Sequence, residues 1–93
     1  MRVMLKFTIP VERGNATAED GSMQRAIDAV VAHVKPEAAY FFVEDGRRAG
    51  LLFFKPADGA AIMHVNETLF KSLDAAVTVT PALTLDELHR GFA

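Results

Sequence analysis

Tyr40 and Lys6 form the one pair in this sequence suited to proton transfer. Tyr40 lies in the apolar run from Ala38 to Glu44, and Lys6 lies in the alternating run from Val3 to Ile9. An ammonium group beside a phenol lowers the pKa of the phenol, so the pair would act as a catalytic acid or base. The alternative, which we favour, is that Tyr40 packs in a subunit interface while Lys6 extends to its rim.

Asn66 is a polar residue inside an apolar helical stripe that includes Ile62 and Leu69. A buried amide needs hydrogen-bond partners, so Asn66 is expected either to contact a ligand between the helices and the sheet or to bond the backbone. We favour the backbone bond. The candidate ligand-binding residues are Asn66, Tyr40, Phe42 and Thr78.

Metal and cofactor sites are not predicted. The chain has no cysteine, and its three histidines (His33, His64 and His89) are too far apart in sequence for a metal-ligand motif. The charged cluster of Glu44, Asp45, Arg47 and Arg48 is interpreted as a solvated turn with one cross-strand ion pair.

Composition and charge exclude several classes of partner. Ten Lys and Arg residues against twelve Asp and Glu residues give a net charge of −2, without the basic excess that nucleic-acid binding needs. No apolar run approaches the length of a membrane span, and the N-terminus lacks the pattern of a signal peptide. We therefore expect one domain over residues 1–93, in the cytoplasm, that binds neither nucleic acid nor membrane.

Residue periodicity predicts an α+β fold of the ferredoxin-like βαββαβ type. Its four-stranded antiparallel sheet would carry two helices on one face, and a short C-terminal helix would follow. Residues Val11 to Gly21 are polar and small and are predicted to form a loop. The predicted elements are a strand over Val3 to Ile9, a helix from Ser22 to before Pro36, strands over Ala38 to Glu44 and Arg47 to Lys55, a helix that Asp58 caps, a strand over Ala75 to Thr80, and a last helix that begins at a Thr84 and Glu87 capping box and reaches about Arg90.

The face of the sheet opposite the helices is predicted to carry large apolar side chains beside the polar Lys6, Thr8, Thr78 and Thr80. A two-residue Asp45-Gly46 turn would pair Glu44 with Arg47, which fixes the residues that share a face. A second copy stacked on this face would bury on the order of 800 Å² per subunit, which is enough for a stable homodimer. The predicted interface residues are Met4, Tyr40, Phe42, Leu51 and Phe53.

The chain resembles the dimeric α/β-barrel superfamily, in which two ferredoxin-like subunits pack their sheets together. The resemblance lies in element order, in the apolar face and in the stretches MRVMLKFTIPV, PEAAYFFVEDGRRAGLLFFKP and AAVTVTPALT, which are similar to those of small uncharacterised bacterial members. Relatives in that superfamily include antibiotic-biosynthesis monooxygenases and muconolactone isomerases. In its haem-degrading members an Asn, a Trp and a His contribute to the site. This chain has Lys6 and Phe7 on the first strand where those members have the Asn, and it has no Trp. His64 is the one possible counterpart of the His, and its position on the helical wheel predicts that it faces solvent.

Two functions remain open from the sequence. The first is a homodimeric module that binds a small apolar or aromatic molecule or acts in assembly, since apolar surface is abundant and convergent polar groups are few. The alternative is a cofactor-independent monooxygenase or isomerase that uses Tyr40, Lys6 and Asn66. Convergence of at least two of these side chains in one pocket would distinguish the enzyme.

Overall fold

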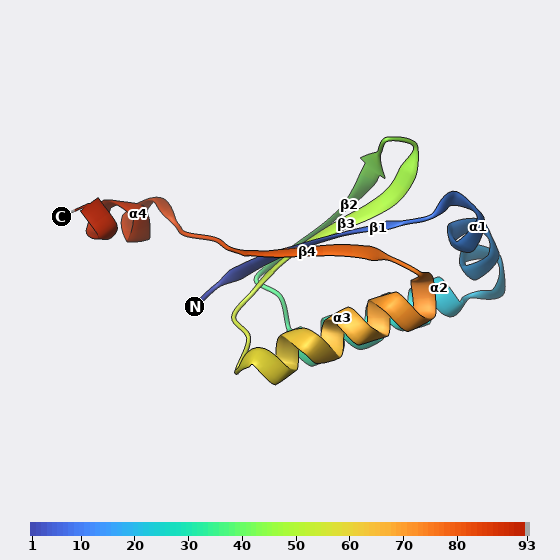
Figure 1. Ribbon diagram of the computed structural model, residues 1–93, viewed down its shortest axis with the longest axis horizontal. Coiled ribbons are helices and arrows are strands. Elements are labelled where there is room, and N and C mark those ends of the chain that lie inside the picture. Colours follow the sequence, from blue (N-terminus) through green and yellow to red (C-terminus); the bar gives the residue numbers. More distant parts are fainter. Residues whose placement is uncertain (93) are drawn as a thin grey trace.

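Four antiparallel strands form an open sheet with two long helices against one face (Figure 1). The computed structural model describes residues 1–92, and the strand order is β2-β3-β1-β4. Helices α2 and α3 lie on the same side of the sheet, α1 lies at one end, and α4 projects from the other end. The elements are β1 (Val3–Ile9), α1 (Val11–Asp20), α2 (Ser22–Val34), β2 (Ala38–Glu44), β3 (Arg47–Phe54), α3 (Gly59–Leu73), β4 (Ala76–Pro81) and α4 (Leu85–Phe92).

The predicted hairpin register is confirmed. Glu44 pairs with Arg47, and Asp45 and Gly46 between them have φ values of 51° and 76°. Two successive positive φ values define the tight turn that matches the twist of the flanking strands. The residues of β2 and β3 therefore share faces as the sequence predicted.

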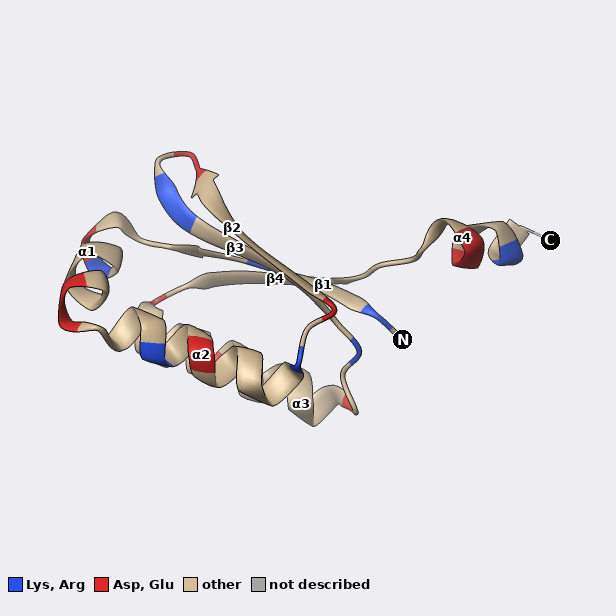
Figure 2. Ribbon diagram, turned by 180° about the vertical axis from the view of Figure 1, so that it is seen from behind, with Lys and Arg blue, Asp and Glu red and all other residues tan. Residues whose placement is uncertain are grey.

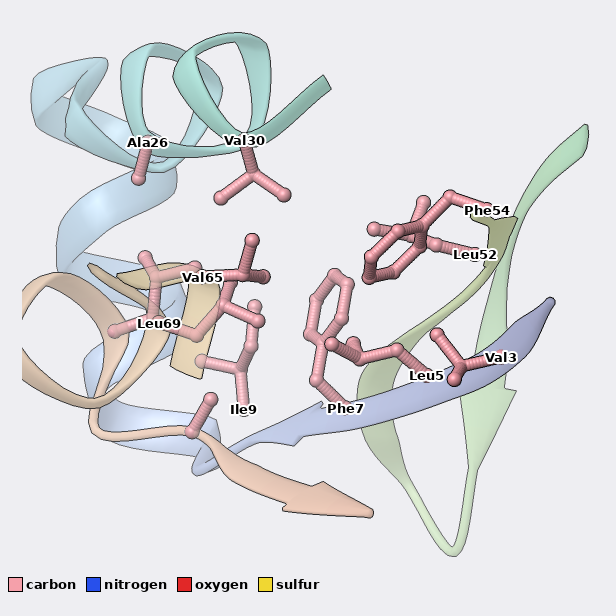
Figure 3. Packing of buried hydrophobic residues seen from close by; sticks show 12 residues of the cluster. Val3, Leu5, Phe7, Ile9, Ala26, Val30, Leu52, Phe54, Val65 and Leu69 are labelled. Carbon is pink, nitrogen blue, oxygen red and sulfur yellow. The ribbon is translucent and has the colours of Figure 1, made fainter. Parts of the chain in front are cut away.

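The core lies between the sheet and helices α2 and α3 (Figure 3). Alternate residues of β1 point into it, because side chains alternate between the two faces of a strand. Burying each large apolar side chain contributes roughly 1.5 to 3 kcal/mol. The side chains that are almost completely buried include Leu5, Phe7, Leu52, Phe54, Val65 and Leu69.

The loop predicted over Val11 to Gly21 is wrong, because residues Val11–Asp20 form helix α1. Gly14 and Thr17 are the buried residues of this helix. A Cβ atom at Gly14 would lie 2.8 Å from Arg48 Nη1, so the helix packs closely against the hairpin. A helix that buries a glycine and a threonine has no apolar stripe, which explains why periodicity did not reveal it.

Gly50 lies where the aromatic ring of Phe7 crosses the neighbouring strand. The two residues are paired between β1 and β3, and a Cβ atom at Gly50 would collide with the Phe7 ring. The crowding at Gly50 therefore comes from the adjacent strand and not from a helix. Only glycine leaves room for this ring.

The predicted caps of α3 and α4 are confirmed. The Asp58 carboxylate accepts a hydrogen bond from the Ala61 backbone N–H at 3.0 Å. At α4, Thr84 N donates to Glu87 Oε1 at 2.9 Å and Glu87 N donates to Thr84 Oγ1 at 3.1 Å, which completes the capping box. Helix α4 continues to Phe92, two residues beyond the predicted end at Arg90.

Candidate functional site

The sheet face opposite the helices is uncovered by the described residues and carries large apolar side chains beside the polar Lys6 and Thr78. The strand registers place Met4 beside Phe53 and Tyr40 beside Leu51 on this face, with Phe42 following on β2. Tyr40 is 60% exposed and Phe42 is 38% exposed. Figure 2 shows charged residues at the hairpin tip and the chain ends, whereas most of each strand is uncharged. We call this surface the free face, defined by Met4, Tyr40, Phe42, Leu51 and Phe53.

Lys6 also lies on the free face, but its ammonium group contacts Glu44. The distance from Lys6 Nζ to Glu44 Oε2 is 2.7 Å, and both side chains are a little more than one-third exposed. This ion pair differs from the expected one between Glu44 and a hairpin arginine. Tyr40 lies two strands from Lys6, about 10 Å across the sheet. The structure therefore pairs Lys6 with a carboxylate and leaves Tyr40 at the edge strand.

Asn66 lies on α3, on the other side of the sheet from Tyr40. Its Oδ1 atom is buried and has no hydrogen-bond partner among residues 1–92. Thr78 on β4 pairs with Lys6 on the free face, and strands β1 and β3 lie between Thr78 and Tyr40. Within one chain, the sheet separates Asn66 from Tyr40, Lys6 and Thr78. The three catalytic candidates thus do not meet in one pocket.

An apolar groove opens between the start of α2 and strand β2, on the helix side of the sheet. It consists of two adjoining hollows of about 340 and 220 Å³ that share Met23, Ile27 and Phe41. Phe41 is 54% exposed, because α2 and α3 pack mainly over the inner strands and leave β2 uncovered. We call this the Phe41 groove; its lining includes Ala18, Met23, Ile27, Phe41, Phe7 and Arg48.

Two histidines that are distant in sequence come together in the structure. The ring centroids of His33 on α2 and His64 on α3 are 4.4 Å apart. Both residues are exposed, and the predicted solvent-facing position of His64 is confirmed. No cluster of three or more metal-ligating side chains occurs within residues 1–92. Sequence spacing missed the pair because it forms only when the two helices pack side by side.

The start of α4 is held by a small ionic cluster. Arg2 Nε donates to Glu37 Oε2 at 2.9 Å, and Arg2 Nη1 donates to Glu87 Oε1 at 2.6 Å. The Thr84 backbone N–H and the Arg2 guanidinium lower the pKa of Glu87 to about 2. Glu87 is therefore ionised throughout the neutral range and keeps the first turn of α4 beside the N-terminal strand.

Comparison with known proteins supports the fold and says nothing of activity. No protein-family model and no curated protein matches the chain. Among solved structures, the chain is similar to the de novo designed protein Ferredog-Diesel, with a TM-score of 0.53 and 9% identity over 87% of this chain and 85% of that one. This likeness, together with the four-stranded antiparallel sheet, is consistent with a ferredoxin-like fold. Among the described helices, none has the length and apolar character that crossing a bilayer requires.

Proposed function

We propose that the protein is a self-associating module whose free face binds the free face of a second copy. The observation that supports this proposal is the position of Tyr40, Phe42 and Phe53 on a sheet face that no described helix covers. Large apolar groups gathered on one exposed face are typical of an interface. The pairing is that of the dimeric α/β-barrel superfamily, which the chain resembles.

Surface burial explains why a second copy is the partner. A chain of 93 residues buries only a small core on its own. Association with a second copy buries more apolar surface without a longer chain. A two-fold axis through the free face lets one apolar patch meet the same patch of the partner. Lys6 and Glu44 border this patch and neutralise each other, so the association brings no unpaired charge together there.

Replacing Phe42 with Glu tests the proposal. About 75 Å² of the Phe42 ring is exposed, taking 38% of roughly 200 Å². At about 25 cal/mol per Å², losing this burial costs about 2 kcal/mol per copy and about 4 kcal/mol per dimer. The dimer Kd should rise by at least several hundredfold, and the buried carboxylates would add to this effect.

The matched control is Met63→Glu, which places the same charge on the exposed face of α3. Light scattering should show monomers for Phe42→Glu and dimers for Met63→Glu at the same concentration. Circular dichroism establishes that both variants are folded. A folded Phe42→Glu variant that remains fully dimeric would refute the proposed interface.

A further inference from the structure

Two imidazole rings meet on the surface of the helix layer. The ring centroids of His33 on α2 and His64 on α3 are 4.4 Å apart, and the ring planes are inclined by 43°. Both residues are exposed, so water and dissolved ions reach the rings. Neither residue takes part in the proposed dimer contact, because α2 and α3 lie on the side of the sheet opposite the free face (Figure 1).

The helix backbone that carries both rings is fixed by the core. Val30 lies three residues before His33, and Val65 directly follows His64; the two valine side chains are 3% and 0% exposed (Figure 3). Helices α2 and α3 also contact each other, so neither histidine moves far without disturbing close packing. The two imidazoles are therefore held near each other before any ligand arrives, which reduces the entropic cost of binding both to one ion.

The separation of the rings suits two ligands of one metal ion. An imidazole nitrogen binds a transition metal at about 2.0 to 2.1 Å, which places the ring centroid about 3.2 Å from the ion. Two such centroids are about 4.5 Å apart at a nitrogen–metal–nitrogen angle of about 90°, and about 5.2 Å apart at the tetrahedral angle. The observed 4.4 Å agrees with the right angle. Each ring must turn one nitrogen toward the ion, and the broad χ2 preference of histidine permits this.

We propose that His33 and His64 bind one Cu²⁺ ion, each through one imidazole nitrogen in adjacent positions of a tetragonal coordination sphere. Right-angled ligand pairs are typical of Cu²⁺ and Ni²⁺, whereas Zn²⁺ prefers a tetrahedral set, and Cu²⁺ binds nitrogen ligands most tightly among these ions. Within residues 1–92 no third metal-ligating side chain is grouped with the pair, so water occupies the other positions. The site is formed by one chain and does not depend on self-association.

The surroundings of His33 accommodate a hydrated cation. His33 lies in the last turn of α2, where the free backbone carbonyls of a helix favour positive charge. A hollow of about 210 Å³ beside His33 leaves space for water ligands. Lys55 also lines this hollow, but it is exposed, and its long stem lets the ammonium group turn away into water.

Titration with the Cu²⁺ complex of iminodiacetate tests the site. This chelator leaves adjacent positions of the ion open and suppresses weak binding to single groups such as the N-terminal amine. Calorimetry should show that the wild type binds the complex at least about tenfold more tightly than His33→Gln or His64→Gln, because two ligands held together act as a chelate. The matched control is His89→Gln, which removes an exposed histidine of α4 and should bind as the wild type does. Circular dichroism establishes that all variants are folded.

Two further readouts distinguish a shared ion from separate sites. Pulsed electron paramagnetic resonance should detect two imidazoles on the copper in the wild type and one in each single variant of the pair. The copper complex should also raise the urea midpoint of the wild type but not of these variants, because both ligands are in place only when α2 and α3 are packed together.

Three results would overturn the site. Equal affinities in the wild type and in both variants of the pair would assign the copper to other groups. A single imidazole on the copper in the wild type would leave the two rings in contact with each other alone. A copper-dependent rise in mass by light scattering that either variant abolishes would assign the ion to histidines of different copies.

Discussion

Substitution of Gly50 by alanine should destabilise the protein mainly through a collision with Phe7. The added methyl group would collide with the Phe7 ring, which is 2% exposed and enclosed by the core. Any shift of the ring disturbs the core packing around it and the pairing of β1 with β3, and overpacking of this kind costs about 1 to 3 kcal/mol. For a domain of this size, that loss lowers Tm by about 4 to 8 °C for each kcal/mol.

The assay is urea unfolding at one fixed protein concentration, since association makes stability depend on concentration. Gly59→Ala is the matched control, because a Cβ atom there meets nothing within 4 Å and the site is the first residue of α3. That control should be neutral or stabilising by up to about 1 kcal/mol. Adding Phe7→Leu to Gly50→Ala should recover part of the loss. A Gly50→Ala variant as stable as the control would refute the stated packing of Phe7.

Two further predictions concern buried and ionised side chains. The lowered pKa of Glu87 means that its stabilisation of α4 is complete above pH 4.5 and is lost as the pH falls toward 2. Circular dichroism should show helix loss in that window for the wild type but not for Glu87→Gln, whose amide retains the cap; identical titrations would contradict this. Asn66→Leu should raise the free energy of unfolding by about 1 kcal/mol, because it removes an unpartnered buried oxygen. A urea midpoint lower than that of the wild type would contradict this.

Local patterns predicted most of the elements. Four predictions that depend only on neighbouring residues are confirmed: the alternation in β1, the Asp45-Gly46 turn, the Asp58 cap, and the capping box of Thr84 and Glu87. Helix α1 was missed because its formation depends on packing of Gly14 and Thr17 against the hairpin, which no local pattern encodes.

The candidate site was harder to predict because it depends on contacts between distant segments. The sequence correctly predicted which strand residues share the free face, because the alternation of side chains and the register between strands determine the face on which each residue lies. Two contacts form only when distant segments pack together: the ion pair of Lys6 with Glu44 and the close approach of His33 to His64. The Phe41 groove exists because the helices leave β2 uncovered, and residue spacing does not report how far a helix extends over a sheet.

Sedimentation equilibrium of the wild-type protein at low micromolar concentration tests self-association most directly. We expect a mass of twice the 10.1 kDa chain, independent of the loading concentration. A mass of one chain over the whole concentration range would contradict the proposed role of the free face.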